Sequence, residues 1–211
     1  MGHMSLEEAL SRVSTYAQEL NLDLRRAEDR FKWLLASLLF ARRISAEIAK
    51  RTFRRFMEEG LDTPERILEA GWDRLVEVLD SGGYVRYDFS TASNLLEAMG
   101  RLLRVYGGLE RLHDEAEGPR DLERRLQSLK GLGPVGVNIF LRELRGIWPK
   151  ADPQPSEIAL KMAGKLGLDD PRPYESALVR IHLEFCKKQR CDECPVADWC
   201  RDGGEHHGCG V

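Results

Sequence analysis

Apolar residues recur along most of the chain at intervals of three and four, the spacing that places them on one face of an α-helix. The segment "FKWLLASLLFA" at 31–41 is instead apolar on nearly all sides, which is typical of a helix at the centre of a bundle. Runs of strand length that alternate apolar and polar residues are absent from the sequence. The pattern therefore predicts an all-α fold of six or more short helices joined by tight turns.

Capping residues mark where these helices are expected to begin. Ser45 precedes one helix, and Thr63, followed by a proline, precedes the next, which Gly71 should end. Ser90 or Thr91 is expected to cap a later helix. The proline-rich segment "WPKADPQPSE" at 148–157 cannot be helical throughout and indicates a boundary between two parts of the chain.

Composition and charge narrow the class of protein. The chain has 211 residues, of which 42% are hydrophobic and 32% charged, enough for one large domain or two small ones. It has no apolar run of transmembrane length and no signal peptide, so we expect a soluble intracellular protein without a membrane partner. A net charge of −3 argues against a globally basic nucleic-acid binder, but one basic face would suffice.

The stretch "LKGLGPVG" at 129–136 interrupts the helical pattern. A helix, a Gly-Leu-Gly turn and Pro134 at the first position of a new helix predict a helix-hairpin-helix arrangement, with Leu132 pointing inward. Free N–H groups at the start of the second helix would form an anion site. An ordinary helix–helix turn is the alternative, but the full pattern favours binding of the DNA backbone without base readout.

A cysteine-rich segment follows near the end of the sequence, with spacings of four, two and five residues and a fifth cysteine, Cys209, outside it. Disulfides are not expected in an intracellular protein, so the pattern indicates a metal site. Four ligands within one short loop favour a [4Fe–4S] cluster over zinc, which remains the alternative. The proposed ligands are Cys186, Cys191, Cys194 and Cys200.

Together the apolar first helix, the hairpin and the four-cysteine loop resemble the helix-hairpin-helix Gly/Pro/Asp DNA glycosylases, in particular the endonuclease III branch. The resemblance covers about residues 27–200. It implies a six-helix barrel at 27–147, with the hairpin at about 122–145. It also implies a cluster domain formed by 5–26 and 148–211, with the cysteine loop at 186–200.

The resemblance also implies chemistry. These enzymes flip a base out of the duplex and cleave its glycosidic bond, and a carboxylate after the hairpin stabilises the sugar cation or orients water. Here Val135 occupies the position of the lysine that makes some members strand-cleaving lyases. The expected "Val-Asp-Thr-His" is replaced by "ADPQPSE", whose aspartate, Asp152, is the candidate catalytic residue; Gln154 and Glu157 are weaker alternatives.

The leading hypothesis is therefore a monomeric DNA N-glycosylase of base-excision repair, in the cytoplasm or at the nucleoid, without lyase activity. Its partner would be double-stranded DNA containing a damaged or mispaired base. A catalytically inactive damaged-DNA-binding protein and a zinc-stabilised DNA-binding module are the alternatives. The candidate DNA-binding residues are Lys130, Gly131, Gly133, Val135, Gly136, Arg42 and Arg43.

Overall fold

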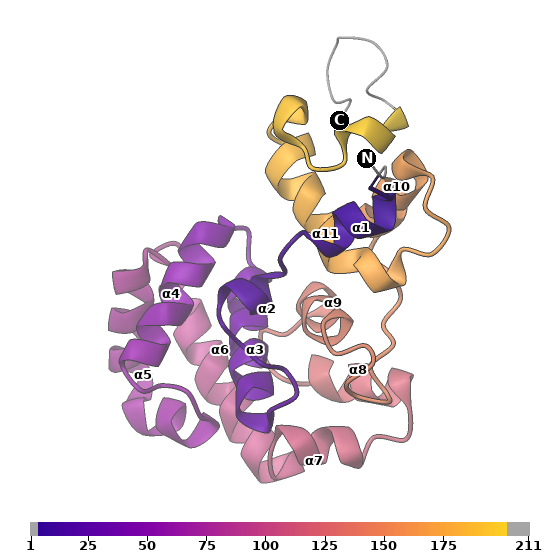
Figure 1. The fold of residues 1–211 in the computed structure, drawn as a ribbon. Helices are drawn as coiled ribbons and strands as arrows, with labels where there is room; N and C mark the ends of the chain where they lie inside the picture. The colour runs from indigo at the N-terminus through magenta and orange to yellow at the C-terminus, as the bar shows by residue number, and fades with distance from the viewer. Residues whose placement is uncertain (1–3, 202–211) are drawn as a thin grey trace. The chain divides into compact units, whose positions relative to one another are not determined.

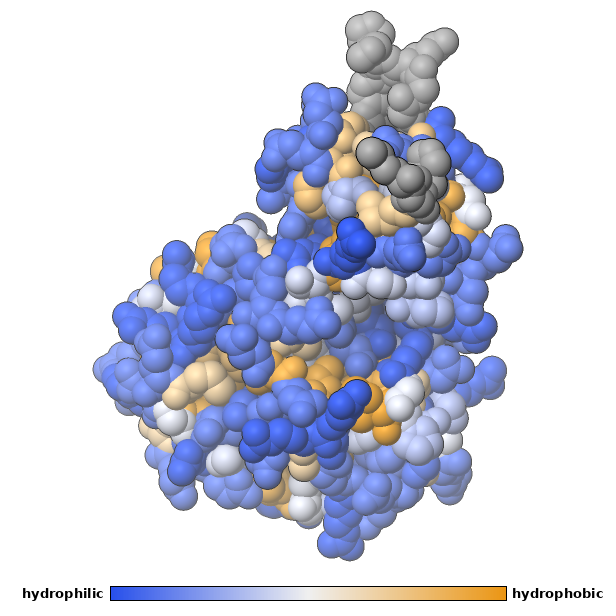
Figure 2. All heavy atoms as spheres, viewed as in Figure 1, coloured by the Kyte–Doolittle hydropathy of each residue, from blue (hydrophilic) through white to orange (hydrophobic). Residues whose placement is uncertain are grey.

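A computed structural model of the chain describes residues 4–201 (Figure 1). Helix dominates this part of the chain and no β-strand occurs in it, which confirms the all-α prediction. Within the same residues, none of the helices has the length and apolar character needed to span a membrane. The face shown in Figure 2 is mainly hydrophilic, with smaller apolar areas.

The chain divides into two compact units, and one of them is built from two separate parts of the sequence. Leu20–Pro153 form the central unit. Within the described residues, 4–19 join 154–201 in the terminal unit. The segments 20–26 and 148–153 thus belong to the central unit, whereas the family resemblance assigned them to the cluster domain.

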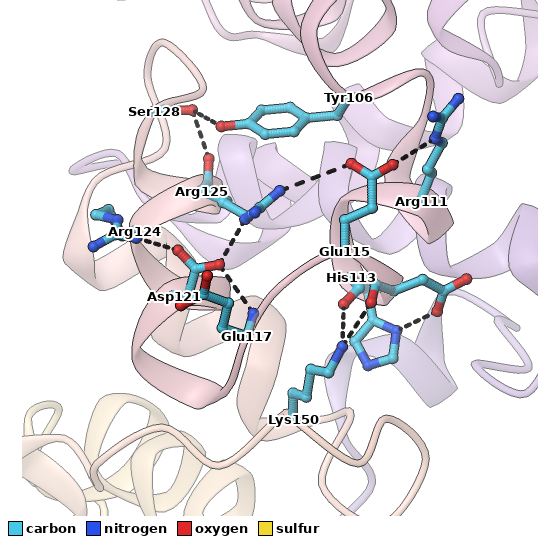
Figure 3. Close-up of polar contacts among 11 residues, drawn as sticks. Tyr106, Arg111, His113, Glu115, Glu117, Asp121, Arg124, Arg125, Ser128 and Lys150 are labelled. Carbon is cyan, nitrogen blue, oxygen red and sulfur yellow. Dashed lines mark hydrogen bonds and ion pairs between the residues drawn. The ribbon is translucent and has the colours of Figure 1, made fainter.

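Polar and aromatic contacts explain why these two segments belong to the central unit. An Nη of Arg30 donates a hydrogen bond to the carbonyl oxygen of Leu24 at 2.9 Å. The Lys150 ammonium donates to the carbonyl oxygen of His113 at 2.9 Å (Figure 3). The Trp148 ring stacks on the His113 ring with centroids 4.3 Å apart. Segment 20–26 therefore contacts α3 (Ala27–Phe40) and segment 148–153 contacts α7 (Leu109–Asp114), both in the central unit.

The helices of the central unit form a closed series of neighbours. The elements are α3 (Ala27–Phe40), α4 (Ala46–Glu58), α5 (Pro64–Gly82), α6 (Asp88–Arg101), η1 (Leu102–Tyr106), α7 (Leu109–Asp114), α8 (Pro119–Gln127) and α9 (Pro134–Arg142). Each helix packs against the one that follows it in the sequence, except that α6 and α7 both pack against the π-helical turn η1 between them. The last helix, α9, packs against the first, α3.

Helix α3 is the most completely buried helix of this series, as its uniformly apolar sequence predicts. Leu34, Leu35 and Leu39 are fully buried, and burial of each such side chain stabilises the fold by about 1.5–3 kcal/mol. The indole N–H of Trp33 donates to the carbonyl oxygen of Phe140 at 3.2 Å, which ties α3 to α9. The helix that carries the hairpin is therefore held directly against the core.

Two expected helix starts are confirmed. The Ser45 hydroxyl accepts a hydrogen bond from the N–H of Ile48 at 3.3 Å, and the Thr63 hydroxyl accepts one from the N–H of Arg66 at 3.3 Å. Gly71 interrupts α5 with φ 74° and ψ 174°, so the helical segments on either side of it are distinct, as the sequence indicated.

The expected start of α6 is wrong. The helix begins at Asp88, after Tyr87, so Ser90 and Thr91 lie inside its first turns. The Ser90 hydroxyl donates to the carbonyl oxygen of Tyr87 at 3.1 Å, and Thr91 is buried. The turn before the helix, not a capping side chain, sets where α6 begins.

The terminal unit has its own apolar core, to which Leu10, Met162, Leu178 and Ile181 contribute. Half-buried cysteines pack against the same core. The elements are α1 (Leu6–Ser11), α2 (Tyr16–Glu19), α10 (Glu157–Leu166), η2 (Arg172–Tyr174), α11 (Glu175–Ile181), η3 (His182–Cys186), η4 (Cys191–Glu193) and η5 (Ala197–Trp199).

Candidate functional site

The glycine stretch forms a tight turn between α8 and α9 of the central unit. Helix α8 ends at Gln127 and α9 begins at Pro134, with the two helices packed against each other. Leu132, in the middle of the turn, is 1% exposed, which confirms that it points inward. Its N–H donates to the carbonyl oxygen of Leu129 at 3.0 Å. The turn is therefore an ordered hairpin anchored by an apolar side chain.

Two of its glycines are required by the fold itself. Gly131 has φ +85°, a left-handed conformation that favours glycine, and a Cβ there would lie 3.1 Å from the Cβ of Asn94. Gly136 packs so closely that a Cβ would lie 2.8 Å from a methyl of Leu132 and 3.2 Å from the Cβ of Ala41. Internal packing and backbone geometry therefore account for both residues.

Gly133 is different, because none of the residues that the structure describes requires a glycine there. Its φ of −80° and ψ of −175° are open to every residue, and a Cβ there would meet no atom within 4 Å. Gly133 is the N-cap of α9, and no described side chain caps this helix start, in contrast to Ser45 at α4. The N–H groups at the start of α9 therefore face an exposed surface that can accept an anion.

Three cations belong to the turn or follow a residue that packs against the start of α9. Ala41, which packs at Gly136, is followed directly by Arg42 and Arg43, and Lys130 stands in the turn itself. Across residues 4–201, no ion pair joins Arg42, Arg43 or Lys130 to a carboxylate. Many other arginines do, among them Arg30, Arg55, Arg66, Arg74, Arg111, Arg125, Arg172, Arg180 and Arg190.

Sequence reasoning missed Arg101 and Tyr106, two polar residues that contact Ser128 next to the hairpin turn. The Nε of Arg101 donates to the hydroxyl of Ser128, the residue before the turn, at 3.0 Å. The hydroxyl groups of Tyr106 and Ser128 also lie 3.0 Å apart (Figure 3). The one signal in the sequence is that Arg101 follows Asn94 by seven residues, which places both on one face of α6.

A polar network fixes α8, the first helix of the hairpin (Figure 3). The carboxylate of Asp121 accepts a hydrogen bond from the backbone N–H of Glu117 at 3.1 Å and one from Nε of Arg125 at 2.8 Å. These bonds, the backbone one above all, lower the pKa of Asp121 to about 2. Arg125 lies over the Tyr106 ring at 5.7 Å, so the network reaches η1.

The structure does not bring Asp152 to the hairpin turn. Its side chain is 58% exposed, with Oδ1 3.9 Å from Nε of Arg145, a residue that follows the end of α9. The nine residues of α9 span about 13 Å, so this end lies well away from Gly133. Gln154 and Glu157, the weaker alternatives, belong to the terminal unit.

Glu123, a carboxylate that sequence reasoning overlooked, neighbours Asp152. Glu123 lies on α8. Burial raises the pKa of its carboxyl group, the charge of Arg120 opposes this shift, and the charge of Asp152 adds to it. Glu123 and Asp152 thus lie near each other beside α8, and neither lies at the hairpin turn.

The cysteine loop places three thiols that are not in disulfides, those of Cys186, Cys194 and Cys200, against the terminal core. Burial raises the pKa of Cys194 and the neighbouring thiols Cys186 and Cys200 raise it too, while a hydrogen bond from the N–H of Val196 opposes them. Such thiols are the soft ligands that iron–sulfur clusters and zinc require.

Cys191 is disulfide-bonded, which the sequence did not lead us to expect. It could join a metal only after reduction, because the thiolate is the ligand. Across residues 4–201, no group of three or more potential ligands is arranged to hold a metal ion. The residue types therefore suit a cluster, but the cluster stays a prediction. Cys209 lies outside the described residues.

Comparison of the chain with known protein families gave no match, and comparison with curated proteins also gave none. The all-α fold therefore rests on the helices themselves. The resemblance to the DNA glycosylases remains an expectation from the sequence motifs.

Proposed function

We propose that the hairpin between α8 and α9 binds the sugar-phosphate backbone of double-stranded DNA. The observation that carries this proposal is Gly133, a glycine that neither backbone strain nor packing requires, at an uncapped helix start. A phosphate that accepts hydrogen bonds from the first amides of α9 needs the space that a Cβ would fill. A phosphate of a bound duplex would account for a glycine at this position, where packing and backbone geometry do not.

Charge supports the same partner. The protein carries a net charge of −3, so any affinity for DNA must come from a local surface. Lys130, Arg42 and Arg43 supply such a surface, because their charges are not neutralised by described carboxylates. Contacts of this kind position a protein on a duplex without reading its bases, so affinity should fall steeply with salt and depend little on sequence.

We further propose that the bound DNA is repaired: the protein flips a damaged or mispaired base and hydrolyses its glycosidic bond. Six of the helices α3 to α9 would form the six-helix barrel of that enzyme class. Asp152 would stabilise the positive charge on the sugar and orient water. Val135 offers no nucleophile, so the strand should stay intact. In the terminal unit Cys186, Cys191, Cys194 and Cys200 would hold a [4Fe–4S] cluster that stabilises the fold.

A damaged-DNA-binding protein without chemistry is the second candidate. It is favoured by the position of Asp152, whose partner Arg145 follows the end of α9 opposite to Gly133. In that case the hairpin and its cations would bind DNA in the same way, and no base would be released.

Gly133→Val tests the central observation, with Gly118→Val as a matched control. Both glycines are N-caps followed by a proline, and a Cβ at either would meet no atom within 4 Å. We expect Gly133→Val to weaken binding of a duplex about tenfold or more, because the side chain blocks the phosphate, and Gly118→Val to bind normally. Fluorescence anisotropy measures the affinities, and thermal unfolding checks that both variants fold.

Equal affinities of the two variants would remove the hairpin from the proposed interface. Duplexes that each carry one lesion or mismatch, assayed for abasic sites, test the chemistry. Release of a base from any of them supports the glycosylase. Binding without release from any substrate would contradict it and favour the second candidate.

A further inference from the structure

Ser128 connects the hairpin to two neighbouring elements. Its hydroxyl donates to the carbonyl oxygen of Arg125 at 2.6 Å, which uses its single proton. Its two acceptor positions are then available for Nε of Arg101 and the hydroxyl of Tyr106, each 3.0 Å away, so Tyr106 is the donor of the second bond. The full hydrogen-bonding capacity of Ser128 is thus used at the residue that precedes the turn.

Arg101 is held through Nε alone. The structure gives its Nη groups no acceptor within residues 4–201, and the side chain is exposed. Arg111, an exposed arginine of α7, is instead bonded to Glu115 at 2.7 Å. Helix α6 also contacts the hairpin at Asn94, seven residues before Arg101, where Asn94 lies next to Gly131. A fixed guanidinium with free Nη groups therefore lies beside the hairpin.

We propose that Arg101 is a further phosphate-contacting residue of this interface and that Ser128 is the positioning residue that holds it. The inference rests on the proposed DNA binding by the hairpin. A guanidinium suits this role because its Nη groups can donate two parallel hydrogen bonds to one phosphate. Fixing Nε beforehand reduces the side-chain entropy that is lost when DNA binds.

Arg101→Gln tests the phosphate contact, and Arg111→Gln is the control. The affinity of the full protein for an undamaged 20-base-pair duplex is measured by fluorescence anisotropy at several salt concentrations. Loss of one phosphate contact should reduce the slope of log affinity against log salt by about 0.9 and weaken binding several-fold at low salt. Arg111→Gln should leave both quantities unchanged, because that charge is already neutralised by Glu115.

Ser128→Ala tests the positioning role. It should weaken binding in the natural protein but have no further effect in the Arg101→Gln background, because Ser128 acts through Arg101. An equal loss in both backgrounds would show that Ser128 merely supports the fold, and would overturn its assigned role.

The outcomes separate this inference from the proposed function. If the natural protein does not bind the duplex, DNA binding and the role of Arg101 both fail. If the natural protein binds and Gly133→Val does not, but Arg101→Gln keeps the natural slope and affinity, only the role of Arg101 is overturned.

Discussion

At the scale of single residues, Val135 and Asp152 decide which chemistry the proposed enzyme can perform. Val135 is 64% exposed in the first turn of α9 and carries no nucleophile, so no Schiff base with the sugar can form there. Borohydride should therefore trap no protein on DNA. Asp152→Asn should abolish most base release while leaving DNA affinity nearly unchanged, because the amide cannot stabilise positive charge. Asp169→Asn, at another exposed aspartate, is the control.

Single-turnover release of base and the amount of trapped adduct measure both effects. Full activity of Asp152→Asn would rule out this carboxylate and direct attention to Glu123, its neighbour on α8. A trapped adduct would point to a lysine, first of all to Lys130, which lies in the turn itself.

At the scale of elements, Asp121 anchors α8, and its titration should be visible in stability. Its pKa is lowered to about 2 by hydrogen bonds from the Glu117 backbone and from Arg125, below its ordinary value of 3.8. A carboxylate with a lowered folded-state pKa stabilises the protein fully above its ordinary pKa, and this contribution is lost as the pH falls towards about 2. Asp121→Asn should therefore cost stability at pH 6 and progressively less below pH 4.

Denaturant unfolding of both proteins from pH 6 to pH 2 gives the difference in free energy of unfolding. Asp73→Asn, at an exposed aspartate of α5, controls for the general effect of acid. A difference between the natural protein and Asp121→Asn that stays constant over this range would contradict the assigned hydrogen bonds.

The elements also show what a sequence can and cannot predict. The caps at Ser45 and Thr63 and the inward Leu132 were predictable because each depends on residues within a few positions. The start of α6 was not, because Ser90 bonds back to the preceding turn. The contact between Arg101 and Ser128 joins residues 27 positions apart and depends on tertiary packing.

At the scale of the whole molecule, the distribution of charge matters more than its sum. The chain has 32 basic and 35 acidic residues, and many arginines are neutralised by carboxylates of their own unit. At the hairpin turn, Lys130, Arg42 and Arg43 accompany an uncapped helix start. A nearly neutral protein can carry a local positive surface, so net charge alone does not exclude an anionic partner.

The predicted metal site lies in the terminal unit, whereas the hairpin lies in the central unit, so the metal can be tested independently of DNA binding. Cys186, Cys194 and Cys200 pack against its core, so binding a cluster there should contribute directly to the stability of that unit. Protein purified without oxygen should contain iron and sulfide, and Cys194→Ser should lose both. Hydrogen exchange of that variant should accelerate in α10 and α11, whereas α3 and α9 of the central unit serve as internal controls. Stoichiometric zinc without iron would instead establish the alternative metal, and unchanged exchange in Cys194→Ser would exclude a structural role for either.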